Sequence, residues 1–71
     1  MTIKRTKAAR GWAFIITDHD NKEVWNGNVE RTIKEAKAGC ITSFIEKRQS
    51  LIKSGNNAEV LLKQIEQARR L

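Results

Sequence analysis

The stretch GWAFIITDHDNKEVW, residues 11–25, decides the fold of this chain. Its first seven residues are rich in aromatic and β-branched side chains, and the same character returns at residues 23–25 after five polar residues. Two strand-forming runs around a polar interruption predict a β-hairpin. A three-residue loop on a type I turn fits the interruption, with Asn21 in the left-handed conformation that asparagine tolerates well.

The register of this hairpin decides which face Trp25 occupies. With the three-residue loop, Ile16 opposes Val24, and Trp25 turns to the face opposite Trp12. A two-residue loop at residues 20–21 would instead place Trp25 beside Ile16. We expect the first register, which makes Trp25 a candidate surface for a partner or for stacking on an exposed base.

The N-terminal segment carries most of the formal net charge of +6. Its first ten residues include four cations and no acid, whereas the rest of the chain carries ten basic and eight acidic groups. The charge pattern therefore divides the chain into a basic N-terminal arm, residues 1–10, and a single α+β domain, residues 11–71. Residues 2–7 also alternate in a way that permits a third, edge strand, which would stabilise a lone hairpin.

Capping residues predict where the first helix begins and ends. Residues 32–35, Thr-Ile-Lys-Glu, form a capping-box sequence, so this helix should begin at Ile33. It can run to Lys53, because Ser54–Gly55 suits a C-terminal cap. A break near Gly39 is the alternative, since glycine costs about 1 kcal/mol in a helix interior.

Apolar stripes predict how the helices pack. The stripe of the first helix covers about half of the circumference, which implies contact with the sheet on one flank and with another helix on the other. A second helix begins at Ala58, capped by Asn57, and carries a narrower stripe. The predicted fold class is α+β. An N-terminal antiparallel hairpin, which can accept a third edge strand, is followed by a long helix and then by a shorter one. The stripe residues of the first helix are Ile33, Ala36, Cys40, Ile41, Phe44, Ile45, Leu51 and Ile52, and those of the second are Ala58, Leu61, Leu62, Ile65 and Ala68.

Length and composition exclude several classes of protein. Seventy-one residues form one domain at most, and 39% hydrophobic with 31% charged residues is typical of a globular chain. A single cysteine cannot close an intramolecular disulfide, which predicts a reducing, cytoplasmic setting. No run approaches the roughly 20 apolar residues of a membrane span, and no signal-peptide core is present, so we expect no membrane partner.

The sequence offers no constellation for catalysis or metal binding. His19 is the only histidine and lies in the expected turn, away from any nucleophile. The polar residues around it lack the further ligands of a calcium loop, and we interpret them as acceptors that stabilise the turn. Cys40 falls on the apolar stripe and should be a small buried hydrophobe. We therefore expect no enzyme, no cofactor, no metal site and no small-molecule substrate.

Two binding functions fit these observations. The first is nucleic-acid binding, with DNA favoured, in a regulatory or accessory role that begins with phosphate contacts from the basic arm. The second is a protein inhibitor or adaptor that binds its partner through the hairpin and helix surface, and size and composition resemble accessory proteins of bacteriophages. Either function is compatible with a homodimer, which would cover the wide helical stripe. The candidate nucleic-acid contacts are Lys4, Arg5, Lys7, Arg10, Lys34, Lys37 and Arg48, with Trp25 as the stacking candidate.

Overall fold

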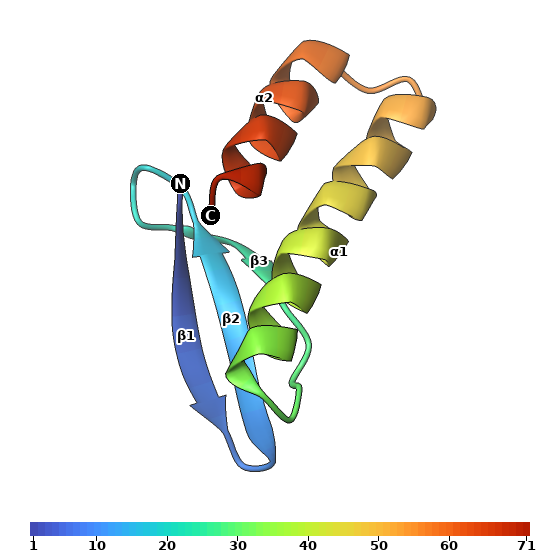
Figure 1. Ribbon diagram of the computed structural model, residues 1–71. Coiled ribbons are helices and arrows are strands. Elements are labelled where there is room, and N and C mark those ends of the chain that lie inside the picture. The colour runs from blue at the N-terminus through green and yellow to red at the C-terminus, as the bar shows by residue number, and fades with distance from the viewer.

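A three-stranded antiparallel sheet followed by two helices forms the protein in a computed structural model that describes residues 1–71 (Figure 1). The predicted α+β class, with a hairpin followed by two helices, is confirmed, and the third strand is present at the N-terminus. Strand order in the sheet is β1-β2-β3. Neither helix combines the length and the apolar character needed to cross a membrane. The elements are β1 Thr2–Ala8, β2 Gly11–Thr17, β3 Glu23–Asn26, α1 Ile33–Lys53 and α2 Ala58–Arg69.

The basic N-terminal segment contributes the edge strand β1. It pairs with β2 over its whole length, from Thr2 opposite Thr17 to Ala8 opposite Gly11. The strands are joined by a tight turn at residues 9–10, so the register follows directly from the sequence positions. Residues 2–8 of the predicted arm therefore lie within the sheet, and their side chains alternate between its two faces.

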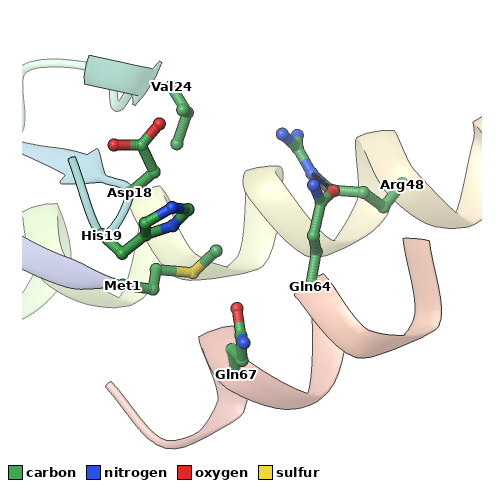
Figure 2. A pocket seen from close by; sticks show the side chains of 7 residues that line it. All are labelled: Met1, Asp18, His19, Val24, Arg48, Gln64 and Gln67. Carbon is green, nitrogen blue, oxygen red and sulfur yellow. Dashed lines mark hydrogen bonds between the residues drawn. The ribbon is translucent and has the colours of Figure 1, made fainter. Parts of the chain in front are cut away.

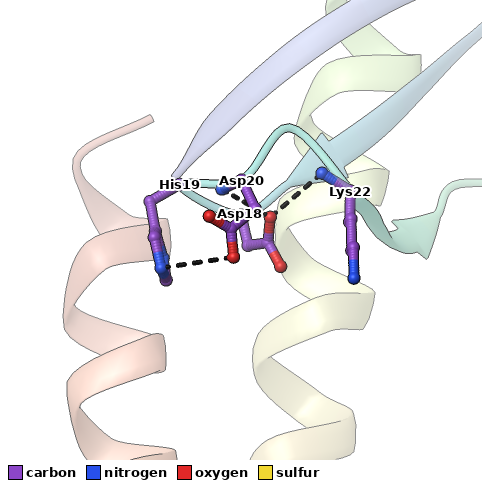
Figure 3. A network of polar contacts seen from close by, with 4 residues as sticks. All are labelled: Asp18, His19, Asp20 and Lys22. Atoms are coloured by element: carbon purple, nitrogen blue, oxygen red, sulfur yellow. Dashed lines mark hydrogen bonds and ion pairs between the residues drawn. The ribbon is translucent and has the colours of Figure 1, made fainter.

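The loop between β2 and β3 has the predicted form. Asn21 is left-handed, with φ 62°, and the Asp18 N–H donates to the Lys22 carbonyl at 2.9 Å. The Asp18 carboxylate accepts hydrogen bonds from the backbone N–H groups of Asp20 at 2.9 Å and Lys22 at 3.0 Å (Figure 3). These bonds, that from Lys22 above all, hold the pKa of Asp18 below its ordinary value. The polar residues of this segment thus stabilise the turn, as expected.

The predicted hairpin register is wrong beyond the loop. Thr17 opposes Glu23, but Ile16 opposes Trp25, because the register shifts between Ile16 and Thr17. Val24 is the extra residue on the bulged strand, and one extra residue reverses the alternation of every side chain after it. Trp25 therefore lies on the same face as Ile16, against α1, and not on the opposite face.

Helix α1 begins and ends at the predicted residues. The Thr32 side chain caps it by accepting from the Glu35 N–H at 3.1 Å. At the other end Gly55 has φ +90°, and the Asn56 N–H donates to the Leu51 carbonyl at 3.1 Å. The alternative of a break near Gly39 is wrong: the helix is continuous there, and nothing packs close to the glycine.

The core lies between the sheet and α1. Helix α1 packs across β2 and β3, with Ala36, Cys40 and Phe44 buried toward the strands. The Trp25 indole N–H donates to the Ser43 hydroxyl at 2.9 Å, and its ring meets Phe44 edge-on. The predicted buried position of Cys40 is confirmed, as is the double contact of α1 with the sheet and a second helix.

Helix α2 packs along the C-terminal half of α1 (Figure 1). Asn57 caps it by accepting from the N–H groups of Glu59 and Val60, and its buried residues are Ile65 and Ala68. Leu62, counted in the predicted stripe, is instead 56% exposed, because the helix buries only the narrow side that faces α1. The end of α2 reaches the core beside Ile3 of β1, and the second half of β1 remains uncovered.

Candidate nucleic-acid interface

Two cations lie over one tryptophan ring in the uncovered half of the sheet. Register pairs Arg5 with Phe14 and Lys7 with Trp12, so all four side chains lie on the face that carries α1. The Arg5 guanidinium carbon is 5.0 Å from the centre of the Trp12 ring, and the Lys7 ammonium is 5.3 Å from it. Both distances are within the range of a cation–π interaction.

These two charges are not neutralised by an acid. Both side chains are exposed. The ion pairs Lys63–Glu59 and Arg70–Glu66 lie along α2, and the contact between His19 and Asp20 lies in the hairpin loop. Glu30 pairs with Trp12 from the other side of β2, and no ion pair joins it to Arg5 or Lys7. We call the surface made by Arg5, Lys7 and Trp12 the basic strip.

Helix α1 turns two further candidate cations toward the same side. Ser43 of α1 contacts Trp25 in β3, which marks the flank of the helix on the β3 side. Lys34 lies about half a turn around the helix from Ser43, and Lys37 about a third of a turn. Both therefore lie on the flank toward β1. Arg10, in the turn after β1, is exposed at the same end of the sheet as Lys7 and Trp12.

Lys4 does not belong to this surface. It precedes Arg5 on β1 and therefore points to the opposite face of the sheet. Its ammonium donates to the Asn21 side-chain oxygen at 2.9 Å, across to the hairpin loop. The cations of the predicted arm are thus divided between two faces because the arm is a strand.

Trp25 and Arg48 lie at a different place from the basic strip. The bulge turns Trp25 inward, where its indole N–H donates to the Ser43 hydroxyl and its ring packs edge-to-face with Phe44. The Arg48 guanidinium lies 3.6 Å from the centre of the Phe44 ring and 5.4 Å from that of Trp25. Burial lowers the pKa of Arg48 from its ordinary value. The side chains assigned to one footprint from the sequence are therefore divided between the basic-strip side, the Trp25–Arg48 contact and Lys4 on the opposite face.

The sequence interpretation did not include Trp12 among the candidate nucleic-acid contacts. The sequence did contain a signal. Arg5 and Lys7 alternate along the first strand, and the tight turn that follows this strand brings Lys7 opposite Trp12. The ring is half-buried, so it both supports the core and faces the cations. An aromatic surface flanked by free positive charge can hold phosphates and the flat faces of bases or sugars.

Comparisons with protein-family models, with curated proteins and with solved structures find no match for this chain. The chemistry of the basic strip and its surroundings is therefore the basis for assigning a function.

Proposed function

We propose that this protein binds nucleic acid, with DNA favoured over RNA, through the basic strip and the adjoining cations of α1. The observation that carries the proposal is the pair Arg5 and Lys7 over Trp12, exposed and free of any acidic partner. Phosphates would replace the missing counter-charges and release the ions condensed on the nucleic acid. Trp12 would add contact with a sugar or an unstacked base.

The geometry favours binding on one side of the sheet. Arg5, Lys7 and Trp12 share a face, and Lys34 with Lys37 lies on the flank of α1 toward that strand. The opposite face carries Lys4, whose ammonium is already bonded to Asn21. A nucleic acid that lies along β1 on the helix side would thus meet up to four cations without a change in the fold.

Fluorescence anisotropy with labelled DNA tests the proposal across a series of salt concentrations. A mixed-sequence duplex and a single strand of equal length are titrated with the wild-type protein and with the double variant Arg5→Ala/Lys7→Ala. The slope of log affinity against log salt is negative, and if each cation pairs one phosphate, the double variant makes it shallower by about 2 for the duplex. Both replaced residues are exposed, and circular dichroism checks that the fold is retained.

Lys4→Ala is the matched control, because it removes a cation from the same strand on the opposite face. We expect its salt slope to equal that of the wild type. An unchanged slope for the double variant, or an equal loss for Lys4→Ala, would contradict the proposal. Absence of binding even at low salt would favour the other function predicted from the sequence, a protein inhibitor or adaptor.

The homodimer, the regulatory role and the cytoplasmic setting stay predictions. Sedimentation equilibrium tests whether the protein is a homodimer.

A further inference from the structure

A pocket lies at the other end of the sheet from Lys7 and Trp12. It has a volume of about 320 Å³, which is at the lower end of the roughly 300–1,000 Å³ of small-molecule sites. Its walls come from Met1 before β1, the β2–β3 loop, β3 and both helices (Figure 2). The lining residues are Met1, Asp18, His19, Val24, Arg48, Gln64 and Gln67.

Arg48 is the one side chain of the pocket that is charged, held in place and without an acidic partner. Its guanidinium lies against the Phe44 ring at 3.6 Å from the centre, and its Nε donates to the Gln64 side-chain oxygen at 3.3 Å. The three ion pairs of the chain do not include it. The stacking and this hydrogen bond restrain the plane of the guanidinium, while its terminal nitrogens have no partner in the chain.

Besides this cation, the pocket holds one carboxylate and three other polar side chains. Asp18 is the only carboxylate of the lining, and one of its oxygens is occupied by the N–H groups of Asp20 and Lys22 in its own turn. Gln64 and Gln67 of α2 provide amide groups, and the His19 ring lies on the opposite wall (Figure 2). The His19 Nε2 is 3.5 Å from an Asp20 carboxylate oxygen. The pocket thus combines one guanidinium with free terminal nitrogens, two side-chain amides, an imidazole and one carboxylate that is partly occupied by its own turn.

We propose that this pocket binds a small oxyanion, a phosphate or carboxylate group, with Arg48 as its main contact. The planar guanidinium presents parallel N–H groups that match two oxygens of either anion. The amides of Gln64 and Gln67, which line the same pocket, would donate to the remaining oxygens. Because the pocket and the basic strip are at opposite ends of β1, this site is independent of the proposed nucleic-acid surface.

Nuclear magnetic resonance of the side-chain N–H groups tests the site. The full chain, labelled with nitrogen-15, is titrated with inorganic phosphate and separately with acetate, each against sodium chloride at equal ionic strength. We expect saturable shifts of the Arg48 Nε–H and of the Gln64 and Gln67 amides with phosphate or acetate, and none with chloride. Saturation by only one of the two anions identifies which oxyanion the pocket prefers.

Two arginine-to-lysine variants separate a built site from general attraction of anions. Arg48→Lys keeps the charge but removes the planar fork, so the affinity should fall at least about tenfold. Arg70→Lys changes an arginine of α2 that pairs with Glu66 outside the pocket, and the affinity should be unchanged. Shifts that do not saturate, that chloride reproduces, or that Arg48→Lys leaves intact overturn the proposal.

The nucleic-acid variants make the two proposals distinguishable. Arg5→Ala/Lys7→Ala should leave the phosphate or acetate titration unchanged, and Arg48→Lys should leave the salt slope of DNA binding unchanged. Loss of oxyanion binding in Arg5→Ala/Lys7→Ala would place the site at the basic strip and overturn the assignment to the pocket.

Discussion

At the scale of single residues, Gly27 permits the closest approach between the strand segment after β3 and α1. A Cβ at this position would lie 2.7 Å from the Cys40 Cβ and 3.1 Å from its Sγ. The position of the Cys40 Cβ is set by the backbone, so this atom cannot rotate away. We expect Gly27→Ala to lower the free energy of unfolding by about 1–3 kcal/mol, as in other overpacked cores. Urea denaturation followed by circular dichroism measures the loss.

Gly39 provides the matched control for Gly27. It lies inside α1, where a Cβ would meet nothing within 4 Å. Gly39→Ala should therefore raise the free energy of unfolding by about 0.5–1 kcal/mol, since alanine restricts the unfolded chain without a clash. Equal effects of the two replacements would mean that the contact between Gly27 and Cys40 does not limit the packing of α1.

The buried thiol of Cys40 predicts a pH dependence of stability. Burial raises the pKa of this thiol above its ordinary value, and its Sγ donates to the Phe14 carbonyl at 3.3 Å. A thiol whose pKa is higher in the folded than in the unfolded protein favours the folded state. This contribution is fully present at pH values below the pKa of the thiol in the unfolded chain, about 8.5. This contribution is lost as the pH rises from there through the folded pKa. The stability difference between wild type and Cys40→Ala should therefore shrink between about pH 8 and pH 10 in urea denaturation. A constant difference over this range would show that the thiol keeps an ordinary pKa.

At the scale of elements, local capping chemistry fixes the ends of the helices. The Asn57 side chain accepts from the N–H groups of Glu59 at 3.1 Å and Val60 at 3.4 Å. We expect Asn57→Ala to lower the free energy of unfolding by about 1 kcal/mol. Asn57→Asp keeps an acceptor oxygen and should retain most of the stability in the same urea titration. A full loss in Asn57→Asp would mean that the amide acts through contacts other than the cap.

The same locality explains how much of the fold the sequence predicts. The cap at Thr32, the glycine turn at Gly55 and the left-handed Asn21 all depend on neighbours within a few residues, and all lie where the sequence placed them. The bulge at Val24 was not predictable in this way. The bulge lets Trp25 contact Ser43 and Phe44, which lie far along the chain. The same loop fits the hairpin with and without the bulge, so the loop residues alone do not decide the register.

The candidate site was predictable only in part for the same reason. Arg5 and Lys7 were identified from charge alone, but the face they share with Trp12 depends on β1 forming a strand. Arg48 was assigned to the same footprint as a cation of the first helix. Its actual neighbours, Phe44 and Gln64, include a residue of α2 that no local pattern connects to it.

At the scale of the whole molecule, α1 connects every part of the core. It packs on β2 and β3 along one side and on α2 along the other. The core cluster joins Phe14 and Ile16 of the sheet to Ala68 at the end of α2. A helix of 12 residues such as α2 is marginal in isolation, so it should depend on this cluster for its stability. We therefore expect the sheet and both helices to unfold together.

Single-tryptophan variants test this cooperativity, because the two rings contact the same core at different places. Trp12 reports on the end of the sheet near the basic strip, and Trp25 on the contact with α1. In both Trp25→Phe and Trp12→Phe, urea transitions followed by the remaining tryptophan and by helical circular dichroism should coincide. Trp25→Phe should also unfold at lower urea, since the Ser43 hydroxyl loses its indole donor. A helical signal that outlasts the fluorescence change in either variant would mean that the helices form a unit stable without the sheet. The basic strip would then be able to open independently of the Arg48 pocket, which draws two of its walls from those helices.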